Sequence, residues 1–285
     1  MKKIMRPPLR SATRSPNSKP AGRRPDPESK MKPTALLTND DGINAAFLHA
    51  LVAACVAEGF DVVVAAPSGE RSWIGRAFSR HREVTLTDYP NLGRQAWSID
   101  GTPSDCVNIA LGHLLPAKPD IVLSGINIGF NATMPLCLSS GTLAGATEGT
   151  AWGLPAVACS LDLESSLFTR VQRDSAFCPP ALRPHLEAAS RHAARFAKGL
   201  VGEPVRGLHV HSLNYPANVT DGTAMERSTP ALVRHGSLFK RTAQGFAFAW
   251  NDGEKTIPSG QTDLAVLERG LISHTVFDFG GTAPL

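Results

Sequence analysis

Several features that define whole classes of protein are absent from this sequence. It has no apolar run of about 18 residues, so no membrane-spanning helix is predicted and we expect no membrane association. The chain also lacks a Cys-x-x-Cys pair, and its odd number of cysteines indicates neither a disulfide framework nor a zinc site. We therefore expect free thiols in a reducing compartment and a cytoplasmic protein. The five cysteines are Cys55, Cys106, Cys137, Cys159 and Cys178.

The positive charge of the chain is concentrated at its start. The formal net charge is +4. Residues 1–30 contain nine Lys and Arg against two acidic residues, a net +7, which leaves −3 for the remainder. A mildly acidic body does not favour a nucleic-acid-binding surface, and we expect no nucleic-acid polymer as a partner.

The basic segment 1–30 differs from the rest of the chain in composition. It is rich in Pro and Ser, has few large apolar residues and lacks the apolar region of a secretory signal. This composition predicts a disordered N-terminal extension. Met31 directly precedes the first apolar strand and would be a natural start. The extension is therefore interpreted as the result of assigning the start codon upstream of the true one.

Buried strands and amphipathic helices alternate from residue 31 to residue 216. An apolar strand at 35–37, a helix at 43–58 and a strand at 61–67 form a βαβ unit, which is nearly always right-handed and parallel. Further strands are predicted at 81–88, 96–100, 119–127, 156–161 and 207–213, with helices from 101 to 115, from 142 and at 183–200. The pattern predicts an α/β fold with a doubly wound, mostly parallel, Rossmann-like sheet as the catalytic core.

The pattern changes after Pro216 to short alternating strands, predicted at 234–236, 245–250 and 271–276. Residues 217–285 are therefore expected to form a hairpin-rich C-terminal lobe. Hairpins of this kind are suited to an appended lobe or to contacts between subunits.

Polar side chains follow three of the predicted strands. Asp40 and Asp41 end the first strand, Ser72 lies in the loop after the second, and Asn127 ends the third. In open α/β sheets the carboxyl ends of the strands border the ligand crevice. Two adjacent carboxylates in a partly desolvated crevice are costly without a cation, and an all-oxygen donor set selects Mg²⁺, Mn²⁺ or Ca²⁺. The alternative is that Asn39 or Asp40 caps the next helix while Asp41 is a solvated turn residue.

A second candidate feature is Ser140-Gly141-Thr142, which opens a helix of small residues. The free N–H groups at such a helix start bind anions. An anion pocket beside a divalent metal argues for phosphate-ester chemistry, with activated water or one of the aspartates attacking phosphorus.

Five motifs occur in an order and at a spacing that resemble the SurE family, the stationary-phase survival-protein nucleotidases. The resemblance implies a metal-dependent phosphatase that acts on nucleoside 5′-monophosphates and, in some members, on 3′-monophosphates. It implies one divalent ion held by Asp40, Asp41, Ser72 and Asn127, and homodimers or homotetramers joined through C-terminal elements. The motifs are TNDDG (38–42), APSGERS (66–72), GTPSDCVNIAL (101–111), PDIVLSGINIGFN (119–131) and SSGTLAGATEG (139–149).

The resemblance also implies phosphate contacts from Asn39 and from Ser140, Gly141 and Thr142. The chain departs from the family after Ser72, where the usual Arg-Ser-Gly-Ala-Ser type of loop is replaced by a larger, more aromatic segment at 71–79. The predicted function is a 5′-nucleotidase with Asp40 and Asp41 as catalytic residues. The alternative is a phosphate- or nucleotide-binding module of the same fold without turnover.

Overall fold

The computed structural model describes residues 32–280 except 206, 251–253 and 257–259. The predictions for residues 1–30 and for Met31 as a start lie outside the described residues. From Lys32 onward the chain forms one compact unit.

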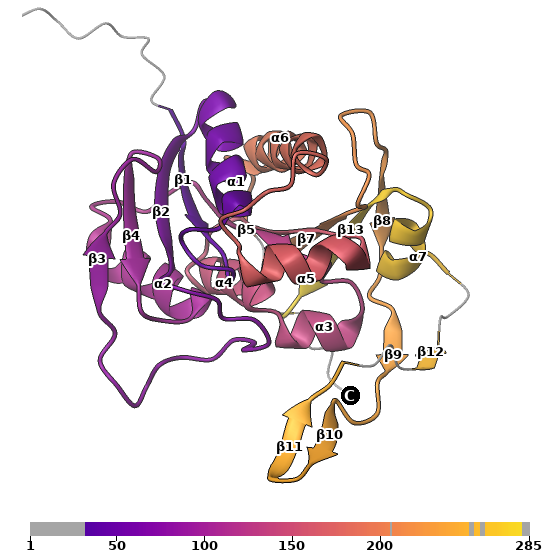
Figure 1. The fold of residues 1–285 in the computed structure, drawn as a ribbon. Coiled ribbons are helices and arrows are strands. Elements are labelled where there is room, and N and C mark those ends of the chain that lie inside the picture. The colour runs from indigo at the N-terminus through magenta and orange to yellow at the C-terminus, as the bar shows by residue number, and fades with distance from the viewer. Residues whose placement is uncertain (1–31, 206, 251–253, 257–259, 281–285) are drawn as a thin grey trace, which may run out of the picture. The chain divides into compact units, whose positions relative to one another are not determined.

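A nine-stranded sheet organises this unit, with the strand order β3-β4-β2-β1-β5-β6-β7-β13-β8 (Figure 1). The six consecutive strands from β4 to β7 are mutually parallel, while β3 and β13 run antiparallel to β4 and β7. The predicted mostly parallel sheet is therefore confirmed. The strands are β1 Thr34–Thr38, β2 Asp61–Pro67, β3 Leu86–Asp88, β4 Gln95–Ile99, β5 Ile121–Ile128, β6 Ala156–Leu161, β7 His209–Tyr215, β8 Met225–Ser228 and β13 Ile272–Asp278.

Helices cover both faces of the sheet because the central strands are apolar on both sides. Ala35 and Leu37 pack with one set of helices, and Leu36 packs with the other. The first set is α1 Ala46–Ala57, α5 Ser165–Arg173 and α6 Arg183–Leu200, and the second is α2 Pro103–Ile109, the π-helix Ala110–Leu114 and α4 Gly141–Ala151. This two-sided core confirms the doubly wound arrangement, and α1 and α6 are seen together on one face in Figure 1.

Several helices and strands of the structure differ from the predicted ones in where they begin or in their type. The first helix begins at Ala46 rather than at Ile43, because the chain first turns through Gly42, whose φ is +97°. The strand predicted to begin at His81 is confined to Leu86–Asp88. Two short helices were not predicted as helices, α3 Met134–Ser139 and α7 Asp263–Glu268.

The C-terminal segment contributes to two kinds of structure. Its strands β8 and β13 belong to the main sheet, although we expected residues 217–285 to form a lobe of their own. Two small antiparallel sheets agree with the predicted hairpins, β9 Leu232–Arg234 with β12 Glu254–Thr256, and β10 Phe239–Thr242 with β11 Gly245–Phe248. The division of the chain at residue 216 stays a prediction.

Two expectations about the chain as a whole concern its cysteines and its helices. All five cysteines are buried free thiols. None of the helices in the described part of the chain has the length and apolarity that crossing a membrane requires.

Candidate active site

The candidate site lies where the direction of strand succession reverses. From β1 the chain proceeds through β2 to β4 on one side, then returns to place β5 on the other side of β1. Such a reversal opens a ligand crevice at the carboxyl ends of the strands. Asp40 and Asp41 follow β1, and Asn127 is the second-to-last residue of β5. The structure thus brings these three predicted site residues to the same edge of the sheet.

The two carboxylates are buried and held by different elements. Asp40 is 3% exposed and Asp41 is 7% exposed. The Thr142 hydroxyl donates to Asp40 Oδ1 over 2.6 Å, and the Ile128 N–H donates to Asp41 Oδ2 over 3.1 Å. Gly42 allows the intervening turn, because its positive φ and its close approach to the backbone of Gly69 would disfavour a side chain.

Burial changes the protonation of this pair. Desolvation raises the pKa of Asp40 to about 6, partly opposed by the hydrogen bond from Thr142. The pKa of Asp41 is raised well above its ordinary value by burial and then by the neighbouring charge of Asp40. Within the described part of the chain, no Lys, Arg or His forms an ion pair with either carboxylate. A buried carboxylate pair without a cationic partner fits a bound metal cation.

Three further oxygen donors adjoin the pair. The Arg71 N–H donates to the Asp40 carbonyl over 2.7 Å, which places Ser72 one residue from that contact. Asn127 directly precedes Ile128, whose N–H donates to Asp41, and its own side-chain amide N–H donates to the Gly129 carbonyl over 2.7 Å. Asn39 is completely buried and donates to Gly42, while its Oδ1 has no hydrogen-bond partner among the described residues.

This donor set suits a hard metal ion. No group of three or more His, Cys, Asp or Glu side chains in the described residues could hold a metal. The candidate ligands are instead two carboxylates, a hydroxyl and an amide, all of which offer oxygen, and hard cations such as Mg²⁺ and Mn²⁺ prefer oxygen. The unpartnered, buried Asn39 Oδ1 adds a further acceptor at the same place.

The start of α4 lies directly against Asp40. Ser140 caps the helix by accepting a hydrogen bond from the Leu143 N–H over 3.0 Å. The N–H groups of Gly141 and Thr142 belong to the first turn of the helix and lack acceptors within it. A Cβ atom added to Gly141 would lie 2.8 Å from the Asp40 Cβ, so a larger residue does not fit there. Of the predicted substrate contacts, the side chains of Ser140 and Thr142 thus have structural partners, and the Thr142 backbone N–H also hydrogen-bonds Asp40, whose pKa it lowers. The backbone N–H of Gly141 is the group at this helix start that is left for an anion.

The model of the family described as survival protein SurE matches residues 35–237. The chain belongs to the SurE family. The protein named 5′-nucleotidase SurE in Desulfovibrio desulfuricans is 36% identical over 252 residues, which cover 86% of this chain and 93% of that protein. The protein of the same name in Methanoculleus marisnigri is 32% identical and covers 89% and 94%. The crystal structure of the SurE protein from Aquifex aeolicus has a TM-score of 0.69 at 24% identity, with 88% of this chain and 95% of that chain covered.

Sequence reasoning missed a polar network that extends the site of this SurE family member across the sheet. The Asn131 side chain donates to the Ser160 hydroxyl over 2.9 Å and lies 3.5 Å from the Thr142 hydroxyl. The Asn131 backbone N–H donates to Asn214 Oδ1 over 2.8 Å. Ser160 and Asn214 lie near the carboxyl ends of β6 and β7, so the strand-end rule used for Asn127 would have found them.

Ion pairs and hydrogen bonds fix the loop that carries Ser72. Arg71 pairs with Asp100, and Arg76 pairs with the buried Glu148 of α4. Glu148 also accepts hydrogen bonds from Asn108 and Trp152. The loop is therefore attached to both the sheet and α4 on either side of Ser72.

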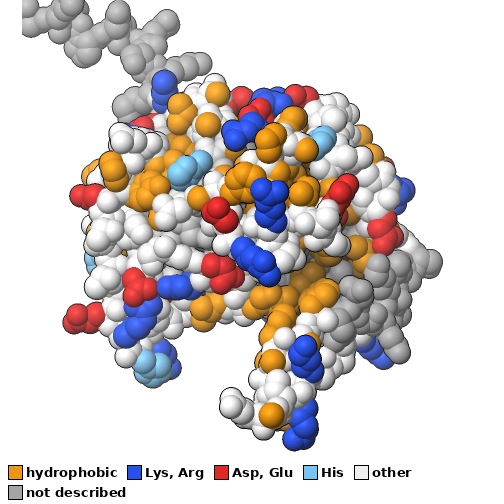
Figure 2. Space-filling view, viewed as in Figure 1, with side chains coloured by type: hydrophobic (Ala, Val, Ile, Leu, Met, Phe, Trp, Pro, Cys, Tyr) orange, Lys and Arg blue, Asp and Glu red, His pale blue; other side chains and the backbone are white. Residues whose placement is uncertain are grey.

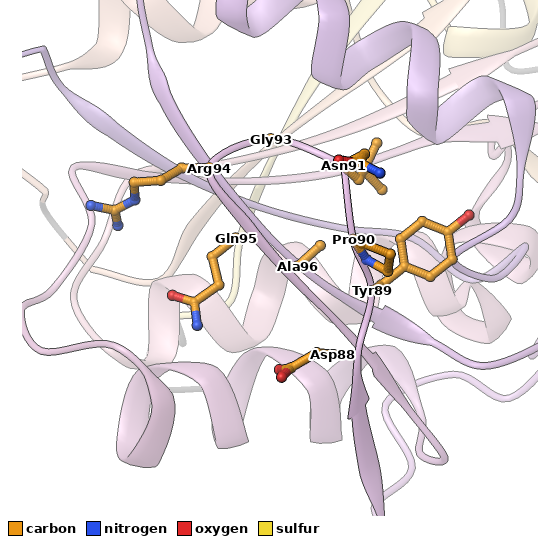
Figure 3. A pocket seen from close by; sticks show the side chains of 9 residues that line it. Asp88, Tyr89, Pro90, Asn91, Gly93, Arg94, Gln95 and Ala96 are labelled. Carbon is orange, nitrogen blue, oxygen red and sulfur yellow. The ribbon is translucent and has the colours of Figure 1, made fainter.

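A surface depression of about 270 Å³ lies elsewhere in this SurE fold (Figure 3). It is lined by residues 88–96, which form the turn between β3 and β4 and the start of β4. Because β4 is parallel to β1, this turn lies toward the opposite edge of the sheet from Asp40. Its position excludes it from the candidate site.

Proposed function

We propose that this protein is a metal-dependent phosphomonoesterase that hydrolyses nucleoside 5′-monophosphates, and also 3′-monophosphates, to nucleoside and phosphate. Its cofactor is one divalent ion, Mg²⁺ or Mn²⁺, and Ca²⁺ is also able to occupy the site. The names of the curated relatives, 5′-nucleotidase SurE, support the substrate class.

The observation that carries the proposal is the buried Asp40–Asp41 pair beside the start of α4. The pair lacks a cationic side-chain partner among the described residues, and the N-terminal first turn of α4, with the backbone N–H of Gly141, lies next to it. A cation and an anion are therefore accommodated side by side, which is the arrangement that a phosphate monoester with its metal requires.

Each residue has a role in this proposal. Asp40, Asp41, Ser72 and Asn127 would hold the ion, which when bound supplies the positive charge that stabilises charge on a phosphoryl oxygen. Thr142 orients Asp40 through its hydroxyl, and the Ile128 N–H orients Asp41.

The phosphate is bound on the other side of the ion site. The start of α4 at Ser140, Gly141 and Thr142 would bind its oxygens, chiefly through the Gly141 N–H, and is preorganised by the Ser140 cap, so its dipoles need no rearrangement as charge spreads in the transition state. Asn39 would contact the phosphate through the amide N–H that it does not donate to Gly42.

A panel of substrates tests the proposal. Phosphate release would be measured from nucleoside 5′- and 3′-monophosphates with Mg²⁺, Mn²⁺, Ca²⁺ or chelator. The proposal predicts release that requires a divalent ion and stops with chelator. Nucleotide binding without any phosphate release would instead identify a binding module of the same fold.

We further propose a cytoplasmic homodimer or homotetramer assembled through the C-terminal hairpins. The β10–β11 hairpin projects from the sheet and exposes Phe239, Phe246 and Phe248 together with basic side chains (Figures 1 and 2). Light scattering coupled to size-exclusion chromatography measures the assembly, and a monomer at micromolar concentration would contradict it.

A further inference from the structure

An exposed tryptophan lies directly beside the candidate metal ligand Ser72. Trp73 is 43% exposed although it is one of the largest apolar side chains. Its φ is +61°, a left-handed conformation that is strained for a bulky residue. The chain therefore holds an aromatic ring at a strained, solvent-facing position next to the site.

The backbone on both sides of Trp73 is attached to the site. Two residues before it, the Arg71 N–H donates to the Asp40 carbonyl over 2.7 Å. Two residues after it, the Gly75 N–H donates to the Ser139 carbonyl over 2.9 Å, immediately before the Ser140 cap. Two residues of chain span at most roughly 7 Å. Trp73 thus lies at the rim between the carboxylate pair and the predicted phosphate site.

Aromatic residues of the C-terminal hairpin support the Trp73 ring. Its centroid lies 5.1 Å from that of Phe248 and 5.6 Å from that of Trp250. The interplanar angles are 57° and 54°, so neither ring stacks flat on the indole. These tilted ring contacts hold the indole in place and leave much of it accessible to solvent.

We propose that Trp73, supported by Phe248 and Trp250, is the platform on which the base of a nucleoside monophosphate stacks. The inference rests on the proposed function. It adds the residue that recognises the nucleoside, which is the leaving group of the reaction. A phosphate bound at Gly141 and Thr142 carries its base one sugar away, at the rim where Trp73 lies. Stacking on an aromatic ring tolerates every base, because every base has a π face. The platform therefore favours nucleoside monophosphates over sugar phosphates without choosing strongly among bases.

The test compares adenosine 5′-monophosphate with ribose 5-phosphate, which lacks the base, in the wild type, Trp73→Ala and Phe78→Ala. Phe78 is a matched control because it is in the same loop and is 42% exposed, and its ring contacts Arg76. Trp73→Ala is expected to lower kcat/KM for adenosine monophosphate about 10-fold, mainly through KM, because that is the typical contribution of one stacked base. The loss for ribose 5-phosphate is expected to be much smaller, and Trp73→Phe should restore most of the difference.

Equal losses for both substrates would overturn the proposal, since Trp73 would then only position Ser72. So would an unchanged Trp73→Ala enzyme, or a variant whose sole change is its oligomeric state, which would make the ring a subunit contact. If the wild type hydrolyses neither ester, the proposed function fails. Calorimetric binding of the same two compounds to the wild type and Trp73→Ala then still tests the platform.

Discussion

The contact between Gly141 and Asp40 offers a direct way to separate site geometry from stability. In Gly141→Ala the new Cβ would lie 2.8 Å from the Asp40 Cβ, 2.9 Å from its Oδ2 and 3.2 Å from the Arg71 carbonyl. All three distances are below normal van der Waals contact, so Asp40 or α4 must move. A displacement of about 1 Å at a reacting centre can lower the rate roughly 100-fold. We expect a loss of this size in kcat/KM for adenosine 5′-monophosphate.

Gly145→Ala provides the matched control one turn further along α4. Its Cβ would lie 2.8 Å from Thr38 Cγ2 and 2.9 Å from the Ser124 hydroxyl, away from the carboxylates. Overpacking costs about 1–3 kcal/mol, of which the better helix propensity of alanine recovers up to about 1 kcal/mol. Both variants should therefore lose similar amounts of unfolding free energy in urea titrations.

Only Gly141→Ala should lose most of its activity at saturating metal. Wild-type kcat/KM in Gly141→Ala would refute the reasoning, because the strand-end carboxylate would then have no role that depends on its position. Equal activity losses in both variants would also refute it, since the effect would then come from general destabilisation.

Two other predictions concern the ion pair that holds the Ser72 loop and the buried histidines His211 and His274. Glu148→Gln removes the charged partner of Arg76, so the unfolding free energy measured in urea should fall by about 1–3 kcal/mol, and no change would contradict the role of the pair. Burial lowers the pKa of His211 to about 4 and that of His274 to about 3. In the unfolded chain these two histidines take up protons below about pH 6.5 while in the folded chain they do not, so their contribution to stability should fall as the pH falls from 6.5 towards 4. His274→Gln should flatten this dependence, and an equally steep loss would contradict it.

The meeting of Asp40, Asp41 and Asn127 could be predicted because it follows from one rule. Parallel strands end at the same edge of a sheet, and the first and third predicted strands end in these polar residues. The capping of α2 is equally local, since Thr102 and Asp105 form a complete capping box within four residues of chain. Local patterns and the parallel sheet together account for the core of the site.

Other parts of the site depend on contacts between distant segments. Ser160 and Asn214 lie near strand ends that the sequence predicts, but their hydrogen bonds to Asn131 join residues up to 83 positions apart, and no local pattern encodes that pairing. The same is true of β13, which enters the main sheet beside β7 from the far end of the chain. The contact of Trp73 with Phe248 likewise requires the hairpin to pack near the loop, which periodicity does not predict.

The central claim is that the buried Asp40–Asp41 pair holds a divalent ion on which phosphate release depends. The most direct measurement is the rate of phosphate release from adenosine 5′-monophosphate as a function of Mn²⁺ concentration, for the wild type and for Asp40→Asn. Circular dichroism would show that both proteins are equally folded. The account predicts a saturable dependence on Mn²⁺ in the wild type, no release with chelator, and loss of turnover in Asp40→Asn. Full activity in the chelated wild type or in Asp40→Asn would contradict it.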